Sequence, residues 1–314
     1  MRPARELPEQ LASHPGLTTS TRRLAFGGPL DWTSMIDYFA FRAIVGVECV
    51  TNGTYRRTIA LDGRSMAIEL EREDAQHVQL RVRGAGASSD ELRRIVANAR
   101  RMFNLDMDID TAVGHLSRDP NIGALVRARP GLRVPGAWDG FEIGVRAIVG
   151  QQVTVAGANT LMARLVARLG TSVEGLEDVG LTRRFPTAPV VASADLDGLG
   201  LVPARATAIT TFARAVVDGA VRLDGAVALD ELVASITAVR GLGPWTAHYV
   251  ALRLGEADAF PSSDLGLRRA LDPADPLPPN ALEKLAEGWR PWRALAAAHL
   301  WMHPAWSSAR RARR

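Results

Sequence analysis

The spacing of apolar residues changes partway along the chain, and this change constrains the fold more than any other feature. Residues 32–43 carry apolar side chains at helical spacing behind Asp31, which is a suitable N-cap. The period then falls to two: over 66–70 apolar residues alternate with small or acidic ones, and over 78–83 with glutamine and arginine, as in strands with one wet face. The tetrapeptide LDGR at 61–64 supplies a tight turn between two such strands.

A helical pattern returns in SSDELRRIVANARRMF, and from about residue 106 onward no convincing strand follows. The sequence therefore predicts an α+β fold. An N-terminal antiparallel sheet with flanking helices occupies 22–105, and an all-α domain in one or two lobes occupies 106–306. Residues 1–21 are expected to form a loose N-terminal segment, and 307–314 a frayed basic tail. Helices are predicted at 108–118, 141–149, 153–169, 204–218, 229–240, 245–254, 264–271, 279–288 and 291–302.

Composition narrows the class of protein. The 314 residues, 47% of them apolar, are enough for two or three domains with proper cores. The net charge is +4, and Lys284 is the only lysine, so nearly all positive charge is arginine. Guanidinium groups pair well with phosphate, which favours a polyanionic partner, although a GC-rich genome would give the same bias.

The single cysteine, Cys49, excludes an iron–sulfur cluster, a cysteine-based zinc site and an internal disulfide. No apolar run approaches the roughly 18 residues of a membrane span, and the first residues lack the apolar centre of a secretory signal. We therefore expect a cytoplasmic protein.

The stretch VRGLGPWTAHYVALR at 239–253 places two glycines and a proline between two helical segments. A dinucleotide fold would need a strand before the glycines, but LDELVASITAV has helical spacing. What remains is a helix, a glycine hairpin and a second helix. Gly241 and Pro244 could simply end one helix and begin the next. Alternatively, the glycines let a DNA phosphate approach the hairpin amides.

Asp264 follows Trp245 by 19 residues and begins another helix, where its role could be capping alone. A glycine hairpin with an aspartate at that distance, however, resembles the helix-hairpin-helix superfamily of DNA glycosylases. Over 22–306, four blocks resemble AlkA-type 3-methyladenine DNA glycosylase II. They are DWTSMIDYFAFRAIVGVE, PGLRVPGAWDGFEIGVRAIVGQQVTVA, GLGPWTAHYVALR and WRPWRALAAAHLW.

The resemblance implies a role for each matching position. Asp264 would face the sugar of a flipped nucleotide and stabilise the positive charge that builds as the glycosidic bond breaks. Gln152 would enter the gap in the duplex, where the best-known member has an apolar wedge, and Ser263 replaces a second aspartate. The base pocket would comprise Trp245, Tyr249, Trp301 and Gln151, and the phosphate-binding hairpin Arg240, Gly241, Leu242 and Gly243. For any single aromatic residue, core packing is the alternative role.

Bifunctional members of the superfamily carry a lysine where this chain has Trp245, so we expect base release without strand cleavage. No cofactor is expected to be required. The resemblance implies at most a structural Na or K ion at the backbone carbonyls of Thr237, Val239 and Leu242. The expected partner is double-stranded DNA with alkylated bases such as 3-methyladenine and 7-methylguanine, bound by a monomer at the bacterial nucleoid. Two alternatives of the same fold remain open, namely a non-catalytic binder of alkylated DNA and a regulatory protein.

Overall fold

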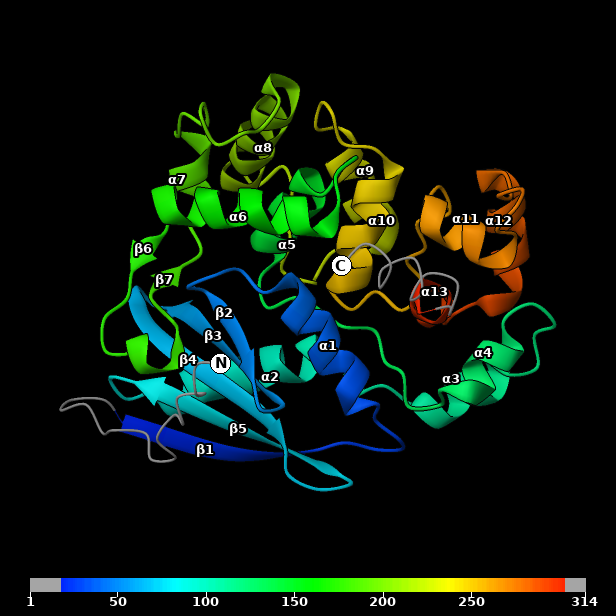
Figure 1. Ribbon diagram of the computed structural model, residues 1–314, viewed down its shortest axis with the longest axis horizontal. Coiled ribbons are helices and arrows are strands. Elements are labelled where there is room, and N and C mark those ends of the chain that lie inside the picture. The colour runs from blue at the N-terminus through cyan, green and yellow to red at the C-terminus, as the bar shows by residue number, and fades with distance from the viewer. Residues whose placement is uncertain (1–17, 303–314) are drawn as a thin grey trace, which may run out of the picture.

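The computed structural model describes residues 18–302. Most of the expected loose segment 1–21 and all of the expected tail 307–314 lie outside the described residues. The described chain has the predicted α+β order, in which a five-stranded sheet with two helices is followed by a helical region (Figure 1). Its first elements are β1 (Thr18–Ala25), α1 (Trp32–Arg42), β2 (Glu48–Thr51), β3 (Thr54–Leu61), β4 (Arg64–Arg72), β5 (His77–Gly84) and α2 (Ser89–Met102).

The sheet has the strand order β1-β5-β4-β3-β2, and every neighbouring pair is antiparallel. The predicted turn joins β3 to β4, with positive φ at Asp62 and Gly63, as a two-residue hairpin requires. Asp31 caps α1 by accepting a hydrogen bond from the Ser34 amide at 3.0 Å. Apolar residues of α1 and α2 pack on one face of the sheet and form the core of this domain.

The sheet departs from the sequence prediction in two ways. Residues 18–21, expected to belong to the loose segment, are the first half of β1, so the domain begins at least four residues before the predicted boundary at 22, because 18–25 pair along the whole length of β5. The second face of β4 is also covered: Ala67 is buried with Val173, Leu176 and Leu181 from the helical region. A strand expected to have one wet face is therefore enclosed on both sides.

The rest of the described chain is helical except for one two-residue strand pair, β6 (Thr171–Ser172) and β7 (Arg183–Arg184), which the sequence did not predict. Strands this short leave no period to detect. The helices α4 and α7 were also missed because they are only one to two turns long. The helices are α3 (Ile109–Leu116), α4 (Gly123–Ala128), α5 (Gly140–Val149), α6 (Val155–Leu169), α7 (Ala188–Ala192), α8 (Pro203–Val217), α9 (Leu229–Thr237), α10 (Pro244–Arg253), α11 (Leu265–Leu271), α12 (Pro279–Ala286) and α13 (Arg293–Trp301).

A buried ionic cluster joins the sheet to helix α5. Arg57 of β3 donates to Glu142 of α5 at 2.7 Å and lies 3.6 Å from Glu48 of β2. Arg146 pairs with both carboxylates, and the Tyr55 hydroxyl donates to Glu48 at 2.7 Å. Because removing one member would leave a buried charge unpaired, this cluster holds α5 in a fixed position relative to the sheet.

Candidate functional site

The glycine hairpin joins α9 to α10 at the upper centre of the molecule in Figure 1. Gly241 has a φ of +89°, in the left-handed region where any side chain is strained. A Cβ at this position would also lie 3.3 Å from the Cβ of Ala208 on α8. Gly243 is the N-cap of α10, and no described atom lies within 4 Å of where its Cβ would be. The backbone at the start of α10 is therefore open to a ligand.

The carbonyls that the resemblance assigns to a monovalent cation belong to the end of α9 and to the hairpin. The Val239 oxygen accepts a hydrogen bond from the Leu242 amide at 3.0 Å, and a carbonyl oxygen has a second lone pair for an ion. Thr237 is the last residue of α9, where carbonyls lack helical partners. Neutral carbonyl oxygens are of the donor type that a hard cation prefers. Among residues 18–302, no group of three or more His, Cys, Asp or Glu side chains could hold a metal ion.

Asp264 is the N-cap of α11 and accepts three hydrogen bonds. Its Oδ1 accepts from the Leu267 amide at 3.0 Å and from the Trp301 indole Nε1 at 3.1 Å. Its Oδ2 accepts from the Trp245 indole Nε1 at 2.8 Å. The capping role is therefore real, and the same carboxylate also connects two aromatic side chains from α10 and α13.

The Asp264 carboxylate fits here because residue 266 is a glycine and has no side chain. A Cβ at position 266 would lie 2.7 Å from Asp264 Oδ1, closer than nonbonded atoms approach, and 3.5 Å from the Trp301 ring. The sequence alone did not single out Gly266, because its φ is not in the left-handed region and only the side chains around it create the requirement.

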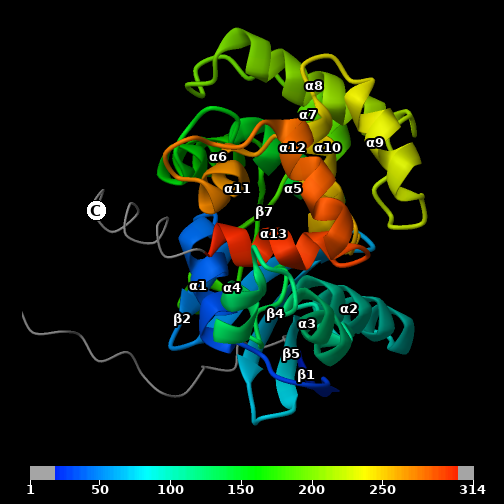
Figure 2. The same cartoon turned by 90° about the vertical axis from the view of Figure 1, so that its right-hand side faces the viewer.

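Three aromatic side chains lie together next to Asp264. Trp245 and Tyr249 are four residues apart on α10, and their rings stack with centroids 5.3 Å apart and an interplanar angle of 13°. Trp301 meets Tyr249 edge to face, with centroids 6.2 Å apart. Helix α13 lies between α11 and α4 in both views (Figures 1 and 2), and it brings Trp301 to Asp264 across 37 residues of sequence. The structure thus brings the predicted carboxylate and aromatic residues into one cluster.

The sequence analysis did not identify the arginine side chain that packs against these aromatic rings. Arg253, one turn beyond Tyr249, is buried, and its guanidinium lies 4.6, 5.0 and 5.3 Å from the ring centroids of Tyr38, Tyr249 and Trp301. It donates to the Pro135 carbonyl at 2.7 Å. The spacing of positions 245, 249 and 253 on one helix face was the available signal. Tyr38 gave no such signal, because α1 reaches the cluster only through the packing of the two domains.

The guanidinium groups change the ionisation of Tyr249. Burial by itself would raise the pKa of this phenol, but the positive charges of Arg253 and Arg42, together with hydrogen bonding to Tyr38 and Arg253, lower its pKa to about 8. Burial instead raises the pKa of Tyr38 to about 12. The first phenol to ionise in the cluster is therefore that of Tyr249.

The two predicted glutamines lie on the turn between α5 and α6. Gln151 is half-buried, and its side-chain amide donates to the Thr246 hydroxyl at 3.1 Å. Gln152 is exposed and has a φ of +57°. Ser263, which replaces the second aspartate of the family pattern, is exposed beside Asp264.

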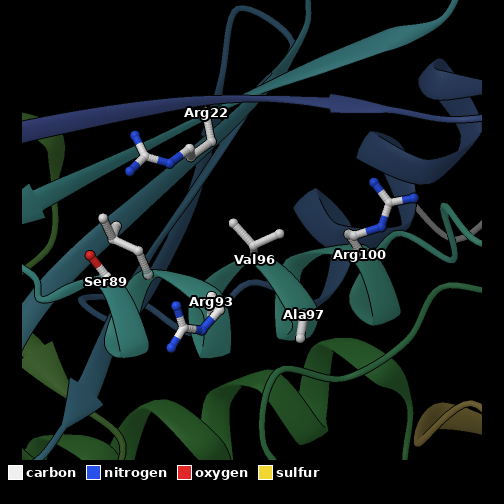
Figure 3. A pocket seen from close by; sticks show the side chains of 7 residues that line it. Arg22, Ser89, Arg93, Val96, Ala97 and Arg100 are labelled. Atoms are coloured by element: carbon white, nitrogen blue, oxygen red, sulfur yellow. The ribbon is translucent and has the colours of Figure 1, made fainter.

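Two surface grooves lie away from this cluster. One, of about 520 Å³, runs along α2 and is lined by Arg22, Arg93 and Arg100 around an apolar floor (Figure 3). Arg93 pairs with Asp90 and Arg100 with Asp106, so two of its three arginines already have carboxylate partners. The other groove lies between the loop after α1 and helix α6. Neither contains the carboxylate and aromatic chemistry found at Asp264.

Comparison with known proteins gives the same two-part organisation. Residues 21–139 match the AlkA N-terminal domain, and residues 145–292 match the HhH-GPD superfamily of base excision DNA repair proteins. A solved structure, a 3-methyladenine DNA-glycosylase from Archaeoglobus fulgidus, superimposes with a TM-score of 0.79 at 23% identity over 91% of this chain and 99% of that one. The Clostridium acetobutylicum 8-oxoguanine glycosylase/lyase bound to double-stranded DNA superimposes with a TM-score of 0.67 at 17% identity, covering 84% of this chain and 89% of that one. The helix-hairpin-helix glycosylase fold is confirmed.

Two relatives are similar in sequence over most of the chain. The DNA-3-methyladenine glycosylase 2 of Escherichia coli is 33% identical over 88% of this chain and 95% of its own length. A probable bifunctional transcriptional activator/DNA repair enzyme AlkA of Mycobacterium tuberculosis is 34% identical over 90% of this chain, which spans only 57% of that relative. The chain therefore belongs to the AlkA family of helix-hairpin-helix DNA repair glycosylases.

Proposed function

We propose that this protein is a monofunctional DNA glycosylase that flips alkylated purines, of the 3-methyladenine and 7-methylguanine type, out of duplex DNA and releases them by hydrolysis. The observation that carries the proposal is the position of Asp264, a carboxylate held by two indole N–H groups and a helix amide beside a cluster of aromatic rings. A relative with this chemistry in its name covers nearly all of this chain.

The reaction needs charge stabilisation more than acid catalysis. When the glycosidic bond breaks, its electron pair leaves with the base, and positive charge develops on the sugar. A fixed carboxylate stabilises that charge more than it stabilises the neutral sugar of the bound nucleotide. An alkylated purine is already cationic and leaves readily, so Asp264 has two remaining tasks. It stabilises the oxocarbenium-like transition state, and it orients the water that adds to the sugar carbon and then loses a proton.

The other predicted residues bind the DNA and the base. Trp245, Tyr249 and Trp301 offer ring faces to the electron-poor purine, with Gln151 beside them, and such stacking is worth about 1–3 kcal/mol per base. Gln152 fills the gap that the flipped nucleotide leaves. The hairpin Arg240, Gly241, Leu242 and Gly243 holds a backbone phosphate, and a Na or K ion on the carbonyls of Thr237, Val239 and Leu242 would add positive charge there. No other cofactor enters the proposal.

Cleavage of the strand is not part of the proposed reaction. A lyase step needs an amine that can form an imine with the sugar, and the position after the hairpin holds Trp245. Lys284, the only lysine of the chain, is exposed on α12. We further propose that the protein acts as a monomer at the nucleoid in the cytoplasm. Of its location the structure adds only that no described helix is long and apolar enough to cross a membrane.

Incubation with methylated duplex DNA, followed by chromatography of the freed bases and a denaturing gel of the strands, tests the proposal. We expect free 3-methyladenine and 7-methylguanine and intact strands, which break only when the abasic sites are treated with alkali. Lesions that stay in the DNA while the protein still binds it would instead favour the non-catalytic or regulatory alternative. Strand breaks without alkali would contradict the monofunctional assignment.

A further inference from the structure

The turn between α5 and α6 and the arginine that contacts it, Arg205, each carry one feature that costs free energy. Gln152 has a φ of +57°, a left-handed conformation that non-glycine residues seldom adopt. Arg205, at the start of α8, buries its Nε without a hydrogen-bond partner among the described residues, and leaving a buried polar atom unsatisfied costs free energy. Such costs persist in a folded protein when the arrangement they allow has a use.

Two hydrogen bonds from outside hold this turn in place. Arg205 Nη2 donates to the main-chain carbonyl of Gln151 at 2.5 Å. The side-chain amide of Gln151 donates to the hydroxyl of Thr246 at 3.1 Å. Gln151 is therefore connected at its backbone to α8 and at its side chain to α10, immediately before the strained Gln152.

The contact to α10 reaches the reaction site. Thr246 is buried and directly follows Trp245, whose indole donates to Asp264. The position of the turn is thus connected to the aromatic cluster through a single residue of α10. These two hydrogen bonds therefore restrain the residue that directly precedes Gln152.

We propose that Arg205 and Thr246 are positioning residues, which fix the turn 150–154 so that Gln152 is already placed to enter the duplex as the target nucleotide leaves it. This inference rests on the proposed function, which assigns Gln152 to the gap in the DNA. It changes the expected role of Gln151, whose amide serves to tie the turn to α10. Holding the strained turn before binding removes the cost of ordering it during base flipping.

A simple phosphate contact by Arg205 is the competing explanation, and the lysine variant separates the two. Arg205→Lys keeps the positive charge but loses the planar fork that reaches the Gln151 carbonyl. If Arg205 only attracts phosphate, lysine will restore function; if it positions the turn, lysine will behave like Arg205→Ala. Thr246→Val removes the hydroxyl at nearly constant volume and tests the second hydrogen bond.

Base flipping can be measured without catalysis, using 2-aminopurine fluorescence beside an abasic analogue in a synthetic duplex. We expect Arg205→Ala, Arg205→Lys and Thr246→Val to reduce both the fluorescence change and the rate of 7-methylguanine release about tenfold, as a small misplacement does. Affinity for undamaged duplex should stay within about twofold for Arg205→Lys, because its charge is kept. In a Gln152→Ala background, Arg205→Lys should add little, because both changes disable the same turn.

The matched control is Arg214→Ala. This residue is also an arginine on α8, and its Nε donates to the Ala192 carbonyl at 3.2 Å, far along the helix from the turn. It removes the same charge and one side-chain hydrogen bond from α8, and it should leave the fluorescence signal unchanged. Full activity of Arg205→Lys, or an equal loss in the Gln152→Ala background, would overturn the inference. A normal fluorescence change with no base release by the unaltered protein would overturn the proposed function and leave this inference standing.

Discussion

The two ends of helix α10 are built in opposite ways. Its N-terminal end is a glycine hairpin in which Gly241 is exposed and open space lies beside Gly243. The rest of the helix presents Trp245, Tyr249 and Arg253 into a packed cluster of rings, with a carboxylate at one side and a guanidinium beneath. One end can contact any DNA backbone, because amides do not distinguish sequences, whereas the other depends on particular side chains.

This contrast suggests that a single rigid helix separates two tasks. If the proposed function holds, changes at the hairpin should alter DNA affinity, and changes in the cluster should alter the chemical step. Trp245, which donates to Asp264, lies two residues beyond Gly243, so a phosphate held at the hairpin would place the neighbouring sugar near that carboxylate. Each prediction below tests whether the two tasks can be separated.

The largest effect is expected for Asp264→Asn. The change removes the negative charge and puts an amide N–H₂ against one of the two indole donors. Loss of a group that stabilises developing charge typically reduces the rate about 100-fold or more, so base release should fall at least that far. DNA affinity should stay within about twofold, because the hairpin is untouched. Single-turnover release and fluorescence anisotropy measure the two quantities.

Asp108→Asn is the control for the changed N-cap residue in Asp264→Asn. Asp108 caps α3 by accepting from the Thr111 amide at 3.2 Å, and it takes no part in the proposed site. Asparagine caps a helix about as well as aspartate, so the change of cap alone should cost little stability in either variant, and Asp108→Asn should release bases normally. If Asp264→Asn released bases as fast as the unaltered protein, the assignment of Asp264 to the chemical step would be wrong.

A smaller effect, on DNA affinity and not on the rate of base release, is expected for Gly241→Ala. A Cβ in the left-handed region costs about 1–2 kcal/mol, and here it also meets Ala208 at 3.3 Å, so the hairpin must shift. We expect about a tenfold loss of affinity for duplex DNA, corresponding to about 1.4 kcal/mol, and little change in the rate of release at saturating protein. A binding titration and a single-turnover assay provide the comparison.

Gly219→Ala is the control for Gly241→Ala, because it introduces the same backbone strain at a site outside the hairpin. Gly219 has a φ of +72° with no described atom within 4 Å of its Cβ position, and it follows the end of α8 remote from Ala208. It should lose similar stability but bind DNA normally. Equal affinities for the two variants would mean that the hairpin does not hold the backbone.

The sequence predicted the parts of this site that have local signals. The role of Asp264 came from the family resemblance, whereas helical spacing and paired glycines identified the hairpin and the face shared by Trp245 and Tyr249. The two-domain order also followed from the change in apolar period. These features depend on residues close in sequence, which is why they could be read without coordinates.

The parts that depend on docking were not predictable. Tyr38 comes from α1 of the other domain, and Arg205 meets Gln151 only because α8 packs against α5. Arg253 was missed for another reason: an arginine at the end of a helix is normally solvated, and its burial follows from three rings and a carbonyl brought from elsewhere. Long-range packing, which has no local period, determines these contacts.

The smallest expected effect concerns the charge at the inner end of α10. Arg253 already lies against the rings that are proposed to stack on a cationic base, so the charge of Tyr249 matters. With its pKa lowered to about 8, Tyr249 should ionise before the other two tyrosines, Tyr38 and Tyr55, whose pKa values are raised. Absorbance of tyrosinate should therefore report one group titrating near pH 8, and Tyr249→Phe should abolish that step.

The sign of the linked stability follows from the same shift. A phenol whose pKa is lower in the folded protein than its usual value near 10 binds fewer protons there than in the unfolded chain. Folding should thus gain stability relative to Tyr249→Phe as the pH rises from about 8 to 10, with no difference from this source below pH 8. Tyr38→Phe should move the titration upward, since it removes one of the groups that lower the Tyr249 pKa. A first tyrosine titrating near pH 10 in the unaltered protein would mean that the guanidinium charge does not reach the rings, and α10 would then lack the charged inner end on which the contrast between its two ends depends.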